Sequence, residues 1–313
     1  MPSYNHAAFV REAVESVLDQ TFQDWELLIS DDCSADDSFS ILKGYAQAKI
    51  VVERNPQNLG TYGTLARLRA KASGDLVAVL NSDDRWSSDK LAKQVALLDA
   101  HPAAAFCYTL GGRIDEKGEP ITGDDHADWP RAEVQELLPH LLEENRILAS
   151  SVVFRRQFLQ FFPELRYSGD WVALLRAARE GPGACVPEPL SHWRMHSSNS
   201  FVRSKPQVAE ETRIRESILR HFEFWMINRV DRRSIRQGLG RCAIHLSALL
   251  VLQGRMAEAR RVALSGVKRD PGRRSLKRLA TVALPPTSAY RRLWGSDPAI
   301  LFDEPGSAFD LTR

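Results

Sequence analysis

Cysteine is scarce in this sequence, and the cysteines that are present stand far apart. Only four of the 313 residues are cysteine, and no two of them form a Cys-x-x-Cys pair. A cysteine-based zinc module or a disulfide framework needs closely spaced cysteines, so their scatter argues against both and favours a reducing compartment. The four positions are Cys33, Cys107, Cys185 and Cys242.

Long hydrophobic runs are also missing. The longest apolar run in the second half, residues 246–252, contains Ser247, whereas a membrane-spanning helix needs about 20 apolar residues. The first six residues show no basic segment leading into an apolar one, so we expect no signal peptide. A composition of 43% hydrophobic and 26% charged residues is typical of a folded globular protein. We therefore expect a cytoplasmic protein.

The net charge of +2 hides an uneven distribution. Residues 203–313 carry 22 Lys and Arg against 11 Asp and Glu, whereas residues 1–202 carry 20 against 29. An acidic front half fits a part that uses a metal ion, and a basic rear half fits contact with an anionic membrane surface or a lipid-phosphate acceptor. A solvated, arginine-rich helical surface would give the same pattern. We expect no nucleic-acid partner.

Two short apolar runs end in paired acids. Residues 76–80 are apolar and are followed by Asp83 and Asp84, and residues 25–29 are followed by Asp31 and Asp32. Such runs are typical of buried parallel strands, whose carboxyl ends border the ligand crevice of open α/β sheets. Paired carboxylates at that edge could hold a divalent metal, or could be polar loop residues.

Strands and helices alternate along the first two-thirds of the chain. Strand-like runs near residues 27, 51 and 78 are separated by segments with helical spacing, which predicts a doubly wound, mostly parallel sheet flanked by helices. We expect a hairpin at Lys117-Gly118, a helix over 132–142, a strand over 151–154, a helix opening at Gly169, and a loop over 191–200.

Helical periodicity dominates from about residue 206 onward. Segments 243–253 and 256–268, joined at Gly254, predict a helical hairpin. The sequence therefore predicts a catalytic domain over residues 1–204 and a basic α-helical region over 205–313.

An ordered set of motifs resembles a known family, the inverting GT-A-fold nucleotide-sugar glycosyltransferases that build bacterial cell-surface polysaccharides (family 2). The resemblance covers residues 1 to about 201. Each motif is weak alone, but four in order are specific. They are Pro2-x-Tyr4-Asn5, Gln20-Thr21-Phe22-x-Asp24-Trp25-Glu26-Leu27, Asp31-Asp32-Cys33-Ser34-x-Asp36 and Asn81-Ser82-Asp83-Asp84.

The resemblance implies how a nucleotide sugar, most commonly a UDP-sugar, is bound. Pro2 and Tyr4 would lie under the base and Asp32 would accept a hydrogen bond from it. Asp83 would lie near the ribose, and Asp84 would be the more direct ligand of a Mn²⁺ or Mg²⁺ ion.

The resemblance also implies the residues that complete the reaction. Asp170, in Gly169-Asp170-Trp171, matches the catalytic base. Arg194 and His196 match a late Arg-x-His loop over the diphosphate, with His196 toward the metal. The implied reaction transfers the sugar to a hydroxyl of a glycan or lipid-linked acceptor, for an enzyme that is cytoplasmic or peripheral at the inner face of the plasma membrane.

Simpler interpretations exist for each of these residues. Asp32 and Asp170 could be helix caps, because Asp is favoured at helix starts. Arg194 could be an ordinary ion-pair partner, and a single loop histidine such as His196 is commonly a surface residue. His6 is interpreted as incidental.

Two departures from the family pattern leave alternatives open. Met1 stands directly before Pro2, where family members have several apolar residues, so we expect an incomplete first strand. A start-site error, a fragment and a real loss of activity all fit. A nucleotide-sugar-binding protein without turnover and a scaffold acting through its helical tail therefore remain alternatives. Cys33 stands where glycine is common, which matters if that position needs a positive φ.

Overall fold

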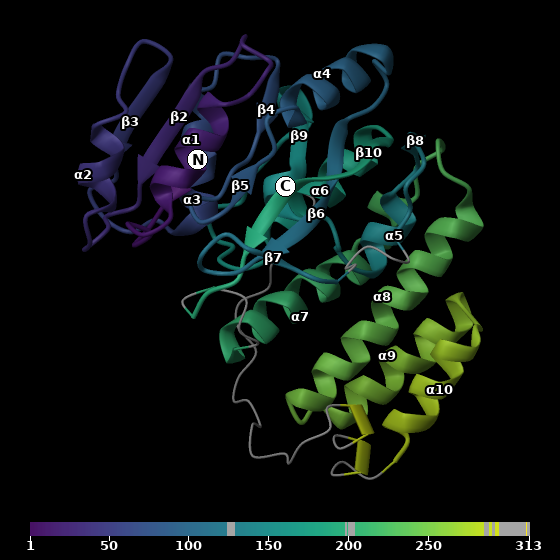
Figure 1. Ribbon diagram of the computed structural model, residues 1–313. Helices are drawn as coiled ribbons and strands as arrows, with labels where there is room; N and C mark the ends of the chain where they lie inside the picture. The colour runs from purple at the N-terminus through teal and green to yellow at the C-terminus, as the bar shows by residue number, and fades with distance from the viewer. Residues whose placement is uncertain are drawn as a thin grey trace. The chain divides into compact units, whose positions relative to one another are not determined.

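Alternating strands and helices build the first part of the chain, and helices build the rest (Figure 1). The computed structural model describes residues 1–123, 129–197, 199, 204–284, 288–289, 292–293 and 311. The strands in chain order are β1 (Pro2–Ser3), β2 (Leu27–Asp31), β3 (Ile50–Arg54), β4 (Leu76–Ala78), β5 (Arg85–Trp86), β6 (Phe106–Ile114), β7 (Pro120–Ile121), β8 (Val134–Gln135), β9 (Val152–Arg155) and β10 (Gly183–Arg194). The helices are α1 (Val10–Leu18), α2 (Ser38–Lys43), α3 (Gly60–Lys71), α4 (Lys90–Ala100), α5 (Leu138–Glu143), α6 (Gly169–Glu180), α7 (Lys205–Arg220), α8 (Arg232–Leu252), α9 (Met256–Arg269) and α10 (Arg273–Val282), with 3₁₀ turns η1 (Ala149–Ser151), η2 (Arg156–Phe158) and η3 (Phe222–Trp225).

The contacts divide the chain into two units. One consists of residues Met1–Leu137 and Arg146–Ser200, and the other of Leu138–Asn145 and Phe201–Arg313. The domain boundary predicted at residue 204 would place α5 in the catalytic domain. In the structure α5 belongs to the helical unit. None of the helices in the described ranges is both long and apolar enough to cross a bilayer.

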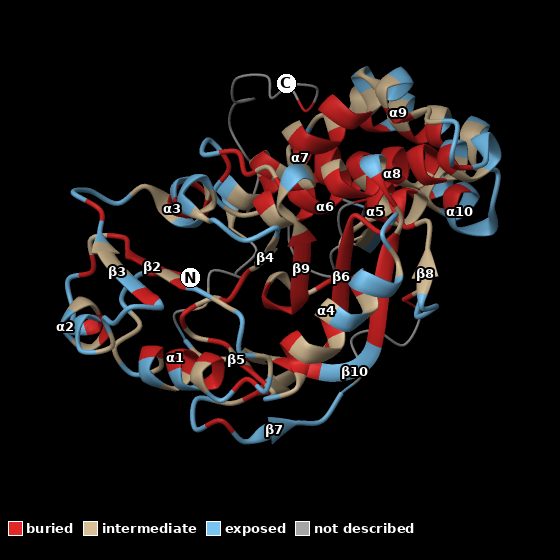
Figure 2. Cartoon of the chain, turned by 90° about the horizontal axis from the view of Figure 1, so that it is seen from above, coloured by how far each residue is buried: buried red, intermediate tan, exposed pale blue. Residues whose placement is uncertain are grey.

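The first unit contains two sheets. Strands β1, β2 and β3 lie side by side in parallel, with Leu27 opposite Ile50 and Pro2 opposite Ser30. The larger sheet has the order β4-β9-β6-β10-β5, in which β6 and β10 run parallel and the other neighbours antiparallel. Figure 2 shows β9 and the first part of β6 as buried, whereas β10 is buried at its start and exposed at residues 187–189. The predicted β-α-β alternation through β4 is confirmed, and the mixed α/β fold agrees with the expected class.

Two local predictions were wrong for reasons of backbone chemistry. The helix expected over 132–142 begins only at Leu138, because Pro139 fits the first turn of a helix but not its interior. The preceding β8 instead pairs with β10. The loop expected from 191 is the end of β10, which continues to Arg194 across register shifts beside Pro187 and Pro189. The hairpin at Lys117-Gly118 is confirmed, with Gly118 at φ +84°.

The second unit is a set of packed helices. The predicted hairpin is confirmed as α8 and α9, joined through Gly254 at φ +69°. A Cβ on Gly240 would lie 3.0 Å from the Gly266 carbonyl oxygen, so small residues let these two helices approach closely. The core includes Leu246, Leu250 and Ala263.

Candidate active site

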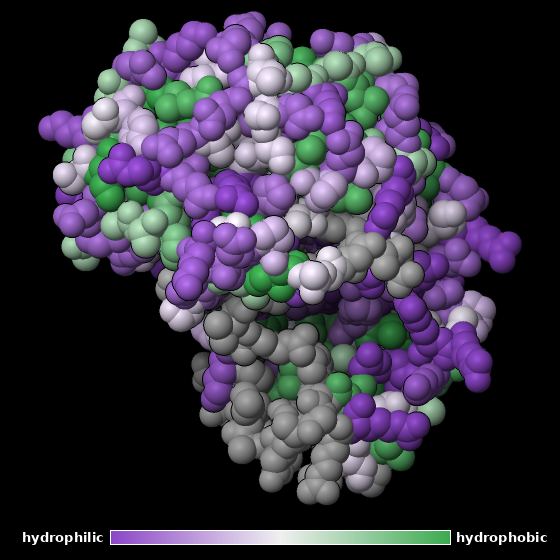
Figure 3. Space-filling view, in the orientation of Figure 1, coloured by the Kyte–Doolittle hydropathy of each residue, from purple (hydrophilic) through white to green (hydrophobic). Residues whose placement is uncertain are grey.

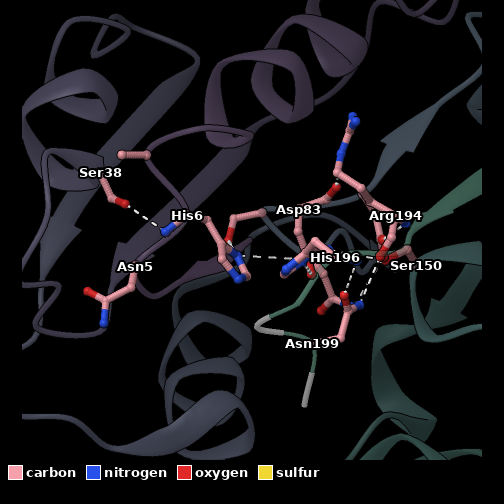
Figure 4. A network of polar contacts seen from close by, with 12 residues as sticks. Asn5, His6, Ser38, Asp83, Ser150, Arg194, His196 and Asn199 are labelled. Atoms are coloured by element: carbon pink, nitrogen blue, oxygen red, sulfur yellow. Dashed lines mark hydrogen bonds and ion pairs between the residues drawn. The ribbon is translucent and has the colours of Figure 1, made fainter. Parts of the chain in front are cut away.

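Two histidines and one aspartate lie together in the first unit. Suitable donor atoms of His6, Asp83 and His196 are all within 4.8 Å of one another. Nε2 of His196 lies 3.1 Å from Oδ2 of Asp83, and Nδ1 of His6 lies 3.9 Å from Oδ1 of the same carboxylate. Figure 4 shows the three side chains converging from separate segments of the chain. Imidazole nitrogen and carboxylate oxygen are both common metal ligands, so the donor set fits a divalent cation.

Local backbone contacts aim His6 into this cluster. Asn5 adopts a left-handed conformation, φ +54°, just after β1, which asparagine tolerates better than most residues. The His6 amide donates to Oγ of Ser38 at 2.9 Å, and the His6 ring contacts Oγ of Ser82 at 2.8 Å. His6, which the sequence alone presents as incidental, belongs to the cluster. The preceding strand β1 has only two residues, so no pattern in the sequence around His6 marks it as a ligand.

Burial and charge set the ionisation of the cluster. Burial lowers the pKa of His6, against an opposing effect of Asp83. Burial alone would raise the pKa of Asp83, but the hydrogen bond with His196 and the nearby His6 hold it below its usual value. A neutral imidazole and an ionised carboxylate are the forms that bind metals.

Asp84 is placed differently from the sequence expectation. Its side chain is buried, with 1% exposure, and its oxygens accept hydrogen bonds from the Ser150 hydroxyl, Asn81 Nδ2 and the Arg194 amide. Burial, together with the charge of Asp83, raises the pKa of Asp84 to about 8. Successive residues point in different directions, so Asp83, and not Asp84, faces the two histidines.

Arg194 is a buried side chain that connects several segments of the first unit. It is 1% exposed and ion-paired to Glu12. Its Nε donates to the Asp83 carbonyl at 2.9 Å, and Nη1 donates to the carbonyls of Asp115 and Glu116 at 3.1 and 3.2 Å. These contacts fit the simpler interpretation of Arg194 as an ion-pair partner. All of the contacts given above for its guanidinium are with other groups of the protein.

Asp32 holds the start of α3. Its Oδ1 accepts from the Leu59 amide and its Oδ2 from the Gly60 amide, both at 2.8 Å, and Asn55 also donates to Oδ1 at 2.8 Å. A carboxylate is favourable at a helix N-terminus. The next residue, Cys33, lies at φ +66°, a conformation that glycine adopts more easily.

The remaining predicted residues, Pro2, Tyr4 and Asp170, lie in or beside β1 and at the start of α6. Pro2 is buried in β1, and Tyr4 is 46% exposed. Asp170 lies in the first turn of α6 and accepts a hydrogen bond from the Tyr62 hydroxyl at 3.0 Å. A Cβ on Gly169 would lie 2.5 Å from the Tyr62 ring, so glycine there lets the ring pack beneath the start of α6.

Comparison with known proteins places this geometry in context. A family model described as "Glycosyl transferase family 2" matches residues 1–161. The chain is 31% identical over 219 residues to TuaG of Bacillus subtilis, a glycosyltransferase named for teichuronic acid biosynthesis, covering 67% of this chain and 83% of the relative. It is 36% identical over 99 residues to WfgD of Escherichia coli, named as a UDP-Glc:alpha-D-GlcNAc-diphosphoundecaprenol beta-1,3-glucosyltransferase, covering 31% of this chain and 39% of that protein.

A solved structure has the same fold. The crystal structure of S. aureus TarS 1-349 in complex with UDP-GlcNAc aligns with a TM-score of 0.60 and covers 93% of this chain and 90% of that one. At 17% sequence identity the likeness concerns the fold alone.

Proposed function

The chain belongs to glycosyl transferase family 2 and is a glycosyltransferase, and we propose that it acts with inversion on a nucleoside-diphosphate sugar. In such a reaction an acceptor hydroxyl oxygen forms a bond to the anomeric carbon while the bond from that carbon to the diphosphate breaks. The observation that carries the proposal is the His6–Asp83–His196 cluster, whose members follow β1, β4 and β10.

We assign the donor as a UDP-sugar. TarS was crystallised with UDP-GlcNAc, and the name of WfgD specifies a UDP-glucose donor. Pro2, Tyr4 and Asp32 would lie on the base side of the nucleotide. The exposed ring of Tyr4 could pack against uracil, while Asp32 fixes the adjoining start of α3.

His6, Asp83 and His196 would hold the metal ion. Two imidazole nitrogens suit Mn²⁺ better than Mg²⁺, which strongly prefers oxygen ligands. The ion, when bound, offsets the negative charge that develops on the leaving diphosphate. In this proposal Asp83 takes the ligand role that the resemblance implies for Asp84, while Asp84 accepts hydrogen bonds from the Ser150 hydroxyl and the Arg194 amide.

Asp170 would take the proton from the acceptor hydroxyl as that oxygen attacks. The hydrogen bond from Tyr62 fixes the orientation of its carboxylate. A positioned general base of this kind contributes about 10²–10⁴-fold to the rate. Inversion needs no second catalytic carboxylate, because the leaving diphosphate departs as a stable anion.

The acceptor would be a glycan or lipid-linked glycan of the cell envelope. The name of TuaG specifies the biosynthesis of teichuronic acid, and the name of WfgD specifies GlcNAc-diphosphoundecaprenol as the acceptor. We further propose a cytoplasmic enzyme in peripheral contact with the anionic inner face of the plasma membrane, through the basic residues of 203–313.

A donor screen tests this function. The protein is heated with a panel of nucleoside diphosphates and their sugars, with and without Mn²⁺, and release of the diphosphate is then measured with the best donor. We expect UDP compounds to raise the melting temperature only with Mn²⁺ and UDP to be released. Binding without release or transfer would support the non-catalytic alternative, and an absence of nucleotide binding would refute both.

A further inference from the structure

A large basic groove lies within the helical unit, formed entirely by residues of that unit. Its volume is about 1340 Å³, and its lining comes from η3, the first turns of α8, the end of α9 and the segment that joins α9 to α10. Figure 3 shows hydrophilic residues in purple along the right-hand side, over the helices of this unit, with apolar residues in green between them. None of the residues proposed for sugar transfer lines this groove.

Cations in the groove outnumber acids, and most of the cations are uncommitted. Arg232, Arg233, Arg236 and Lys268 line it, and all four are exposed. Among the described residues, none of the four side chains has an ion-pair partner within 4 Å. The fifth cation of the lining, Arg269, donates to the Ser265 carbonyl.

Two of the three acids of the lining already have partners within the protein. Asp231 caps α8, where its Oδ2 accepts from the amide and the hydroxyl of Ser234 at 2.8 and 2.9 Å. Asp270 pairs with Arg241, which lies outside the lining, at 3.4 Å. Glu223 is exposed on η3. The local balance is therefore positive, and the field favours an anion.

The start of α10 adds backbone donors to the same groove. Its N-cap is Gly272, which has no side chain to satisfy the first amides of the helix. Exposed helix N-termini bind phosphate through such amides. One guanidinium group can donate two parallel hydrogen bonds to the oxygens of a phosphate. Arginines beside the start of a helix therefore suit the binding of a phosphate and not of a metal cation.

The shape of the site indicates a chain rather than a flat surface. The cations surround a recess whose wall includes Met226, Leu239 and the 41% exposed ring of Phe222. A flat aromatic face suits the apolar side of a sugar ring. The exposed leucines Leu264 and Leu276, which would anchor a helix in lipid, are not part of the lining.

We propose that this groove binds the phosphate groups of an anionic glycan chain and so docks a phosphate-bearing acceptor. The docking role rests on the proposed glycosyl transfer, but the binding itself does not. It is a distinct site from the donor site, built by the helical unit alone.

The test compares two variants that lose the same charge. In the groove variant Arg232→Gln, Arg236→Gln and Lys268→Gln are combined. In the control variant Arg220→Gln, Arg261→Gln and Lys277→Gln remove three exposed cations that lie outside the lining and outside the first turn of α10. The full-length proteins are titrated with short linear inorganic polyphosphate at physiological salt, and far-ultraviolet circular dichroism checks their folding.

We expect the groove variant to lose at least about tenfold in polyphosphate affinity, because each lost charge-assisted hydrogen bond contributes and tenfold corresponds to about 1.4 kcal/mol. The control variant should stay within about threefold of the wild type, since diffuse surface charge is screened. Equal losses in the two variants, or no binding by the wild type, would overturn the proposal.

Two further measurements separate the alternatives. Vesicles of phosphatidylglycerol are offered in place of polyphosphate, with phosphatidylcholine as control. A groove variant that loses vesicle binding but keeps its polyphosphate affinity would make the ligand a membrane and overturn the proposal. UDP binding with Mn²⁺ should be equal in all three proteins. A wild type that binds polyphosphate but no nucleotide would refute the proposed transfer and leave the groove supported.

Discussion

The guanidinium of Arg194 donates its Nε hydrogen to the backbone carbonyl of Asp83 at 2.9 Å. Two residues further on, His196 contacts the carboxylate of the same aspartate at 3.1 Å. The end of β10 is therefore attached to the Asp83 loop through both its arginine and its histidine. Arg194 therefore links the two segments that carry Asp83 and His196, two of the three proposed metal ligands.

Replacing Arg194 with Met should destabilise the protein by about 2–4 kcal/mol. The change removes the ion pair between the buried Arg194 and the partly exposed Glu12, and it leaves the carbonyls of Asp83 and Glu116 without the donor that Arg194 supplies. The Asp115 carbonyl keeps the amide of Gly118 as a donor. Urea unfolding measures the loss. Arg85→Met is the matched control, because Arg85 pairs with the same Glu12 but is about one-third exposed, and its removal should cost at most about 1 kcal/mol. Equal costs for the two variants would contradict the bracing role.

Asp170→Asn should abolish sugar transfer while leaving donor binding nearly intact. Asparagine keeps the size of the side chain but cannot accept the proton, so we expect kcat to fall by at least about 10²-fold. The measurement pairs steady-state transfer with a UDP titration in the presence of Mn²⁺. Near-normal turnover would show that another group takes the proton.

Tyr62→Phe should weaken catalysis through Asp170 without touching the substrate. The phenylalanine ring still packs under Gly169, but the hydrogen bond to Asp170 is lost. We expect kcat to fall by about 3–10-fold, as for the loss of one oriented hydrogen bond, with KM for the donor unchanged. A change in donor KM alone would instead place Tyr62 in the binding surface.

Lys90 should make stability depend on pH. The side chain is completely buried, with Nζ 2.7 Å from Gln94 Oε1 and 4.1 Å from the centre of the Trp86 ring. Burial lowers its pKa to about 7, against 10.5 for an ordinary lysine. Between these two values the unfolded chain binds a proton that the folded chain does not, so the free energy of unfolding rises with pH.

Lys90→Met should remove that slope. Between about pH 7 and about pH 9, unfolding in urea should show the wild type gaining about 2–3 kcal/mol relative to the variant. Lys93→Met removes an exposed lysine of the same helix and should leave the slope unchanged. Parallel pH curves for the wild type and Lys90→Met would mean that Lys90 titrates normally.

Local patterns predicted the order of elements well but not how distant elements pair. The segments through β4 follow from periodicity, because each is defined by neighbours in sequence. The antiparallel pairing of Leu76 with Arg155 joins segments far apart along the chain, and no local signal specifies it. Pro139 is a local signal for the start of α5, because proline fits the first turn of a helix. The spacing of the surrounding leucines predicts a longer helix, which the structure does not contain.

The site shows the same division. The sequence marked the Asp83-Asp84 pair, since acids after an apolar strand are conspicuous. The sequence could not show which of the two carboxylates faces the histidines. This depends on the hydrogen bonds that Ser150 and Arg194, from distant segments, donate to Asp84. His6 was missed because a single histidine after a two-residue strand has no pattern around it.

The central claim is that His6, Asp83 and His196 hold the metal ion. The most direct test is the dissociation constant of Mn²⁺ in the presence of UDP, measured by titration calorimetry for Asp83→Asn beside Asp84→Asn. Loss of a residue outside the ligand set typically weakens metal binding by about 10–100-fold, and loss of a direct ligand should weaken it by more. Asp83→Asn should therefore lose more than about 100-fold in affinity, and Asp84→Asn less than about 100-fold. A larger loss for Asp84→Asn than for Asp83→Asn would contradict the account.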